Sequence, residues 1–147
     1  PVRGDYAELV SSAEHLISGL VYPLPDASGH GLGVHATRTT WGTVTLGPTA
    51  RYQSEKDDYE SNRDSLEYFQ QAACRFLPSL TIGQLKPGGS GIRARCAPAD
   101  ETFSDFRIVR DSKVPRLIHA AGIDSPGLTA ALAIAERIAD LVDATLA

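Results

Sequence analysis

Residues 32–48 read LGVHATRTTWGTVTLGP, the pattern of two β-strands joined by a tight turn. β-Branched and apolar residues dominate segments 32–40 and 43–46, which we therefore expect to be strands. Trp41-Gly42 supplies the turn between them, and Gly47-Pro48 ends the second strand. Because such a short turn joins neighbouring antiparallel strands, this stretch predicts an antiparallel sheet.

The rest of the chain adds strand patterns on both sides of this hairpin, and two helices. Apolar or alternating runs cover residues 2–10, 16–24, 80–85, 92–96, 106–109 and 116–121. Apolar residues at helical spacing predict a middle helix that starts with Ser61-x-x-Asp64 and ends at Pro78. A long C-terminal helix is predicted from Pro126 to about residue 145.

The order of these elements predicts an α+β fold with a largely antiparallel, mixed sheet, one middle helix and a long C-terminal helix. No regular helix follows each strand, so a doubly wound sheet, and with it a Rossmann unit, is not expected within this chain. Residues 51–64 are charged and are predicted to be a solvated connection. Residues 86–91 are rich in glycine and are predicted to be a flexible loop.

The composition is that of a folded domain without a nucleic-acid or membrane-spanning signature. Of 147 residues, 42% are hydrophobic, which is enough to build a core. The net charge is −4 and no segment concentrates lysine and arginine, which argues against a nucleic-acid partner. No apolar run is long enough for a transmembrane segment. Cys74 and Cys96 form no CxxC motif, so we expect a reduced, cytoplasmic protein. A disulfide between them and peripheral attachment to a membrane stay open.

The histidines indicate no metal site, because none forms a pair at metal-binding spacing on a helix. His35 stands out because it lies inside a predicted strand, between Val34 and Ala36. Two interpretations stay open: a hydrogen-bonded structural histidine, or a base that faces a ligand.

Two further segments could contact an anionic or electron-rich ligand. Arg93 and Arg95 occupy alternate positions of a predicted strand, hence one face, where a guanidinium could clamp a carboxylate or remain solvated. Ser125 is the predicted N-cap of the C-terminal helix, and Gly127 lets a ligand approach the backbone N–H groups there. Such a helix start can equally be structural.

Several motifs, taken in order, resemble one family. GLVYPLPD at 19–26, GVHATR at 33–38 and LGP at 46–48 resemble the substrate domain of L-2-hydroxyglutarate oxidases and dehydrogenases, and RGDYAEL at 3–9 fits its opening strand. GIR at 91–93 and SPGLT at 125–129 fit the wider class of FAD-dependent oxidoreductases, which includes D-amino-acid oxidase and glycine oxidase. The family often has proline where this chain has Ala94.

The resemblance implies that this chain corresponds to the C-terminal portion of a larger flavoenzyme. Residues 1–91 would be a portion of the substrate domain, and residues 92–147 would return to the FAD-binding domain. The chain has no methionine, so we expect a processed product or fragment whose partner is an N-terminal Rossmann segment bearing GxGxxG. On its own it would bind FAD weakly or not at all and would be inactive.

The resemblance also implies a chemistry: oxidation of a small 2-hydroxy acid by hydride transfer to FAD. Arg93 would hold the substrate carboxylate and His35 would be the catalytic base. Arg38 and Tyr6 would belong to the substrate pocket. The cofactor residues would be those facing the pyrimidine edge of the flavin, namely Gly127, Leu128 and Thr129. The alternatives are a relative that oxidises an amino acid or glycerol 3-phosphate, and a non-catalytic binding domain with the same fold.

Overall fold

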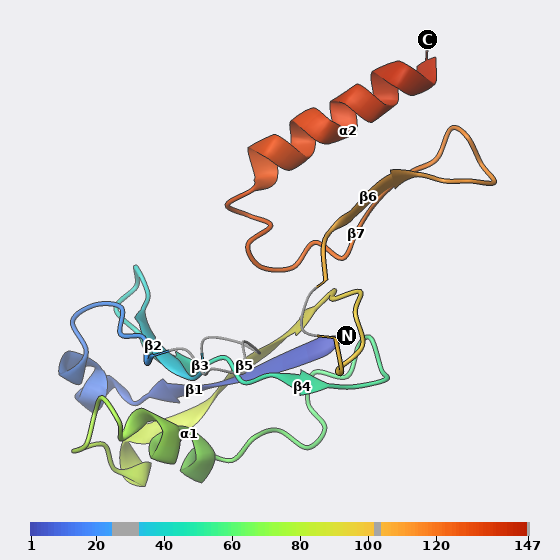
Figure 1. The fold of residues 1–147 in the computed structure, drawn as a ribbon. Coiled ribbons are helices and arrows are strands. Elements are labelled where there is room, and N and C mark those ends of the chain that lie inside the picture. The colour runs from blue at the N-terminus through green and yellow to red at the C-terminus, as the bar shows by residue number, and fades with distance from the viewer. Residues whose placement is uncertain (25–32, 102–103, 147) are drawn as a thin grey trace. The chain divides into compact units, whose positions relative to one another are not determined.

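The computed structural model describes residues 1–24, 33–101 and 104–146, and it divides into two compact units (Figure 1). The N-terminal unit is Val2–Ile92. The C-terminal unit begins at Arg93 and includes Pro1. Each unit has its own sheet and its own α-helix.

The N-terminal unit is built on one mostly antiparallel sheet. Its strands are β1 (Val2–Leu9), β2 (His35–Arg38), β3 (Val44–Gly47), β4 (Arg51–Tyr52) and β5 (Leu85–Arg93). They run in the order β2-β3-β1-β4, and β5 also pairs with β1. The predicted hairpin is confirmed: β2 and β3 pair antiparallel, and the amide of Thr39 donates to the carbonyl of Thr43 across the turn.

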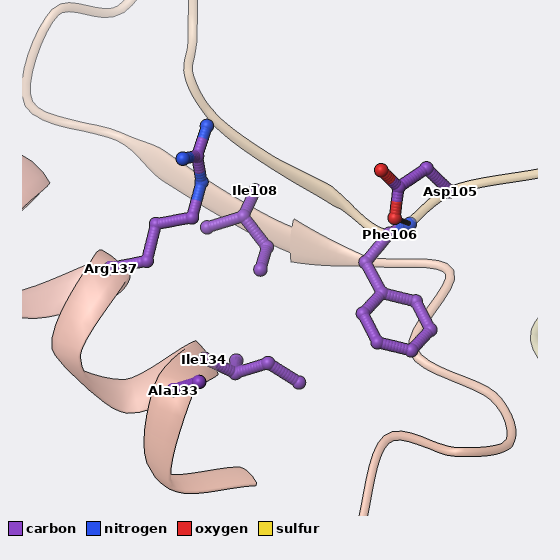
Figure 2. Close-up of a pocket in the computed structure, with 6 residues that line it drawn as sticks. All are labelled: Asp105, Phe106, Ile108, Ala133, Ile134 and Arg137. Atoms are coloured by element: carbon purple, nitrogen blue, oxygen red, sulfur yellow. Dashed lines mark hydrogen bonds between the residues drawn. The ribbon is translucent and has the colours of Figure 1, made fainter. Parts of the chain in front are cut away.

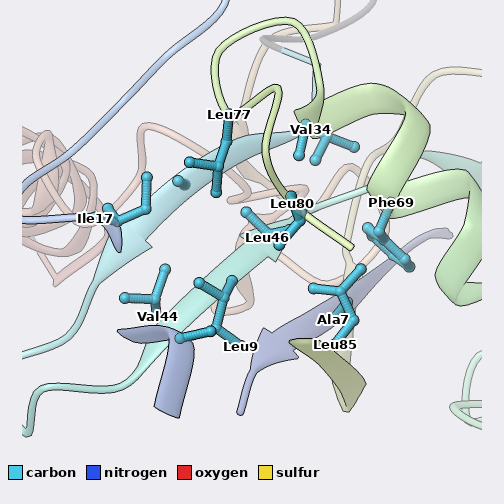
Figure 3. Packing of buried hydrophobic residues seen from close by; sticks show 13 residues of the cluster. Ala7, Leu9, Ile17, Val34, Val44, Leu46, Phe69, Leu77, Leu80 and Leu85 are labelled. Atoms are coloured by element: carbon cyan, nitrogen blue, oxygen red, sulfur yellow. The ribbon is translucent and has the colours of Figure 1, made fainter. Parts of the chain in front are cut away.

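One face of this sheet carries the hydrophobic core (Figure 3). Alternation along the strands places Ala7, Leu46 and Ala36 on that face, all fully buried. Helix α1 (Leu66–Ala73) covers them with Phe69. The 3₁₀ helices η1 (Ser11–Leu16) and η2 (Ile82–Gln84) flank the same core. On the opposite face, the open face of this unit, the side chains of Tyr6, Thr45 and His35 are half-buried within the described residues.

Several sequence predictions for this unit are wrong in detail. Of the strand predicted for 16–24, only an isolated bridge of Val21 to Ala36 forms. The middle helix begins after Ser65, whose side chain accepts from the amide of Tyr68, and not at Ser61. Within the strand predicted for 80–85, Ile82–Gln84 form the 3₁₀ helix η2, and only Leu85 belongs to a strand, β5. The flexible loop predicted for 86–91 lies within strand β5. A Cβ at Gly88 would lie 2.9 Å from the carbonyl oxygen of Tyr6, so glycine permits the close approach of β5 to β1.

The charged segment 51–64 is not merely a solvated connection, because a buried ion-pair network anchors it. Arg3 and Asp5 are almost fully buried, and the Arg3 Nε lies 3.0 Å from the Asp5 carboxylate. The Asp5 carboxylate also accepts from the amide of Asp64 at 3.0 Å. The Arg63 guanidinium donates to the carbonyls of Gly88 and Gly89 in β5. Buried charges require such partners, so the segment folds back over the end of β1.

The C-terminal unit contains a β-hairpin and a helix. Strands β6 (Arg107–Arg110) and β7 (Ile118–Ala121) lie close to the predicted runs 106–109 and 116–121. They pair antiparallel and are followed by helix α2 (Ala131–Leu146). This helix begins later than the predicted Pro126, because residues 125–130 form consecutive turns. Together the units form a mixed α+β structure with mostly antiparallel sheets and a C-terminal helix, in agreement with the predicted class.

Candidate functional site

Three neighbouring strands align Tyr6, Gly47 and His35 in one row on the open face of the sheet. Gly47 pairs directly with His35 of β2. The pairing of Ala7 with Leu46 places Tyr6 opposite Gly47 on the other side. Their chain neighbours point into the core, so the row itself points away from it. The structure thus places two residues predicted for the site, Tyr6 and His35, on one surface.

Gly47 lets the ring of Tyr6 lie over β3. Its φ of 142° is a backbone conformation that favours glycine. A Cβ at this position would lie 2.7 Å from Cδ1 of Tyr6 and 2.8 Å from the carbonyl oxygen of Asp5. The ring of Tyr6 therefore occupies the space that a side chain at Gly47 would need, in the middle of the row.

The hydrogen bond of His35 determines which of its nitrogens can act as a base. Nδ1 lies 3.1 Å from the carbonyl oxygen of Gly33. A carbonyl only accepts hydrogen bonds, so Nδ1 carries the proton and Nε2 of the neutral ring has the free lone pair. Within the described ranges, Nε2 has no hydrogen-bond partner. The ring also stacks on Tyr22, with centroids 4.6 Å apart and planes at 26°.

Arg38 lies on the other face of β2, because it is an odd number of residues from His35. Its guanidinium donates to the carbonyls of Glu14 and Ile17 at 2.8 and 3.0 Å. These hydrogen bonds connect η1 to the β2–β3 hairpin, so Arg38 has a structural role. Its predicted role in substrate binding remains a prediction.

Arg93 is the last residue of β5 and the first of the C-terminal unit. Arg93 and Arg95 are both half-buried and both have interaction partners, and Arg95 donates to the carbonyl of Glu101. Because His35 belongs to the N-terminal unit, a joint role for His35 and Arg93 also remains a prediction.

The segment predicted to contact flavin is a tight turn and not the start of a helix. Gly127 donates its amide to the carbonyl of Asp124 at 2.6 Å, and a Cβ there would lie 2.4 Å from Ile123. Leu128 is 94% exposed, and Thr129 is exposed as well. Among the described residues, the amides of Leu128 and Thr129 have no hydrogen-bond partner. They are therefore suitable donors to an electron-rich ring edge, which fits the edge of a flavin.

A cavity of about 270 Å³ lies between β6 and α2 in the C-terminal unit (Figure 2). Figure 2 shows Asp105 and the ring of Phe106 at one end, Arg137 beside Ile108 at the other, and Ile134 on the helix below. None of the predicted site residues lines this cavity.

An aspartate–histidine pair that the sequence analysis did not single out stabilises the turn of the β6–β7 hairpin. Nε2 of His119 lies 2.7 Å from the Asp111 carboxylate, which also accepts from the amides of Lys113 and Val114. The His119 hydrogen bond, followed by these two amides, lowers the pKa of Asp111 to about 2. The pair belongs to the hairpin of the C-terminal unit.

The described residues provide neither a metal centre nor a membrane-crossing helix. In the ranges that the structure covers, no group of histidine, cysteine and acidic residues could hold a metal ion. Over the same ranges, every helix is too short or too polar to cross a membrane.

Comparison with known proteins gives one family. A family model described as FAD dependent oxidoreductase matches residues 1–141. The mitochondrial L-2-hydroxyglutarate dehydrogenase of Arabidopsis thaliana is 37% identical over 149 residues, which cover 94% of this chain and 30% of that protein. The L-2-hydroxyglutarate dehydrogenase of Salmonella houtenae is 31% identical over 178 residues, which cover 98% of this chain and 42% of that protein. The chain therefore spans less than half the length of these relatives.

A solved structure is also similar. It is dithionite-reduced L-α-glycerophosphate oxidase from Mycoplasma pneumoniae with FAD bound. The TM-score is 0.72 at 27% sequence identity, and the match covers 97% of this chain and 36% of that one.

Proposed function

The chain belongs to the family of FAD-dependent oxidoreductases, and on that premise we propose that it is part of an enzyme oxidising a small 2-hydroxy acid. L-2-hydroxyglutarate is the substrate we propose, because relatives over nearly the whole chain are named as its dehydrogenases. The observation that carries this proposal is the row of Tyr6, Gly47 and His35 on the open face, with Nε2 of His35 able to accept a proton.

In this proposal His35 is the general base. Its Nε2 takes the proton of the substrate hydroxyl, so an O–H bond breaks and an N–H bond forms. The proton on Nδ1 stays in its hydrogen bond to the carbonyl of Gly33, which keeps the ring oriented while it is charged. The phenol of Tyr6, on the same row, is placed to bind a polar group of the substrate.

Arg93 is our candidate for the carboxylate ligand. The planar guanidinium binds a carboxylate through two parallel hydrogen bonds, which fixes the orientation of the acid. This assignment rests on the resemblance of the Gly91-Ile92-Arg93 motif to the family.

When bound, FAD supplies the acceptor for the hydride that leaves the substrate carbon. The amides of Leu128 and Thr129 would donate to the electron-rich edge of the flavin and stabilise negative charge there. Gly127 keeps the turn compact beneath them. We further propose that residues 1–91 serve the substrate and residues 92–147 serve FAD, and that this chain alone binds FAD weakly or not at all.

A second candidate is oxidation of glycerol 3-phosphate, favoured by the structural similarity to a glycerophosphate oxidase. Both reactions need a base for a hydroxyl proton, but they differ in the anion that the enzyme must bind. A non-catalytic binding domain with this fold would reduce no flavin with either compound.

Anaerobic flavin reduction by the full-length flavoprotein separates these functions. We expect L-2-hydroxyglutarate to bleach the oxidised flavin absorbance, and the D-enantiomer and glycerol 3-phosphate to leave it unchanged. Bleaching by glycerol 3-phosphate alone would establish the second candidate. Retention of oxidised flavin with all three compounds would contradict the proposal.

A further inference from the structure

Tyr22 lies beside His35 because of an isolated bridge between their chain neighbours. The amide of Val21 donates to the carbonyl of Ala36, and the amide of Ala36 donates back, both at 2.9 Å. This exchange makes Val21 and Ala36 a hydrogen-bonded antiparallel pair. Tyr22 and His35 are then the adjacent pair without hydrogen bonds, where facing side chains come closest.

The stacked rings restrain His35 on the side away from β3. The centroid distance of 4.6 Å and the angle of 26° are those of offset stacking. On the other side, the partner of His35 in β3 is Gly47, which has no side chain to hold the ring. Tyr22 is therefore the only aromatic partner of His35 among the residues that the structure covers.

We propose that Tyr22 is a positioning residue for His35. Its ring sets the plane of the imidazole, so that Nδ1 stays on the carbonyl of Gly33 and the lone pair of Nε2 stays available to accept a proton. The electron-rich face of the tyrosine ring also suits the imidazolium that proton transfer creates. This inference rests on the proposed function, in which Nε2 of His35 accepts the substrate proton.

Three variants test this role in the full-length flavoprotein. Tyr22→Phe keeps the ring, Tyr22→Leu removes it, and Tyr68→Leu is the control, because Tyr68 is equally exposed but lies on α1. We expect Tyr22→Leu to lower kcat about tenfold with little change in KM, because base catalysis depends on the orientation of the base. Tyr22→Phe and Tyr68→Leu should retain the wild-type kcat. Tyr22→Val gives the same comparison if Tyr22→Leu lowers the folded fraction.

A second readout does not require activity. The ¹⁵N chemical shifts of His35 distinguish a ring protonated only at Nδ1 from a mixture of tautomers. We expect the single Nδ1–H form in wild type and Tyr22→Phe, and a mixture in Tyr22→Leu.

The outcomes separate this inference from the proposed function. If the wild-type flavin is reduced by none of the tested substrates, the proposed function fails and the tautomer comparison alone decides the role of Tyr22. An unchanged kcat and an unchanged tautomer in Tyr22→Leu overturn the inference. A Tyr22→Phe variant as slow as Tyr22→Leu also overturns it, since the hydroxyl and not the ring would then be responsible.

Discussion

All buried leucine side chains of the described residues belong to the N-terminal unit, although each unit combines a sheet with a helix. Leu9 and Leu46 are fully buried, whereas Leu128, Leu132 and Leu146 are 94%, 84% and 74% exposed. Ile108 is the one large apolar side chain of the C-terminal unit that is buried within the described residues. The N-terminal unit is therefore stabilised by its own core, and the C-terminal unit mainly by its hairpin and its turns.

This difference bears on the candidate site. Tyr6, Gly47 and His35 lie on strands whose other face packs into the core. Asp5, on the same strand as Tyr6, accepts a hydrogen bond from the amide of Asp64 and so holds segment 51–64 against β1. A site on strands that are fixed in this way keeps its geometry without a ligand. The turn at Gly127 has no such core behind it, so its shape depends on backbone contacts.

The largest effect is expected from Asp5→Ala in the N-terminal unit. This change removes the nearest carboxylate of the buried Arg3, which keeps only the more distant Asp58, and it removes the acceptor for the amide of Asp64. We expect a loss of about 3–5 kcal/mol in the free energy of unfolding, measured by denaturant titration. Lys86→Ala, which breaks the exposed pair with Glu8, is the control and should cost about 0–1 kcal/mol. Equal costs would show that the buried network does not stabilise this unit.

A matched pair of leucines compares the two units directly. Leu46→Ala should cost about 2–5 kcal/mol, because a fully buried side chain leaves a cavity. Leu141 of α2 is only half-buried, so Leu141→Ala should cost about 1 kcal/mol. Both values come from the same denaturant titration. A Leu141→Ala variant as unstable as Leu46→Ala would mean that α2 is packed far more tightly than its exposure indicates.

Two glycines, one in each unit, differ in the space that the backbone leaves for a side chain. A Cβ at Gly127 would meet Ile123 at 2.4 Å and the carbonyl of Asp124 at 2.7 Å, whereas a Cβ at Gly83 meets nothing within 4 Å. We expect Gly127→Ala to cost about 1–3 kcal/mol through overpacking and Gly83→Ala to change stability by about 0.5 kcal/mol or less. Melting temperatures measure both. No loss of stability in Gly127→Ala would show that the turn can open without cost.

The smallest effect concerns pH and the β6–β7 hairpin. The pKa of Asp111 falls from 3.8 to about 2, chiefly through the hydrogen bond from His119. A lowered pKa means that the ionised form stabilises the fold, so this contribution is complete above pH 3.8 and is lost as pH falls through about 2. An NMR titration of Asp111 should give its midpoint near 2, and His119→Ala should raise it. A midpoint near 3.8 in the unchanged protein would contradict the pairing.

Local sequence patterns predict the strands that alternate in polarity or pair through a short turn. The hairpin at 32–48, the N-terminal strand and the β6–β7 hairpin all follow from alternation and turn residues. Strand β5 is not predictable in this way, because its glycines are typical of a loop. Only the structure shows that Gly88 lies too close to the backbone of Tyr6 for a side chain, which explains the glycine there. Pro126-Gly127 likewise has the composition of a helix start, yet the turn formed with Asp124 delays the helix to Ala131.

The candidate site depends on strand register, which a single sequence does not contain. His35 and Tyr6 are recognisable as candidates, but only pairing through Gly47 places them in one row. Tyr22 lies within the motif at 19–26, yet no local signal places it opposite His35, because the bridge depends on tertiary pairing. Pro25 and Asp26 of that motif lie outside the described residues.

The rate of flavin reduction in a single turnover tests the role of His35 most directly. His35→Asn keeps a side-chain amide that can donate to the carbonyl of Gly33 but removes the lone pair of Nε2. With saturating L-2-hydroxyglutarate, we predict a fall of about 10²–10⁴-fold with unchanged flavin content. His15→Asn, at an exposed position in η1, should retain the wild-type rate. A His35→Asn variant that reduces its flavin as fast as wild type would contradict the assignment of His35 as the base.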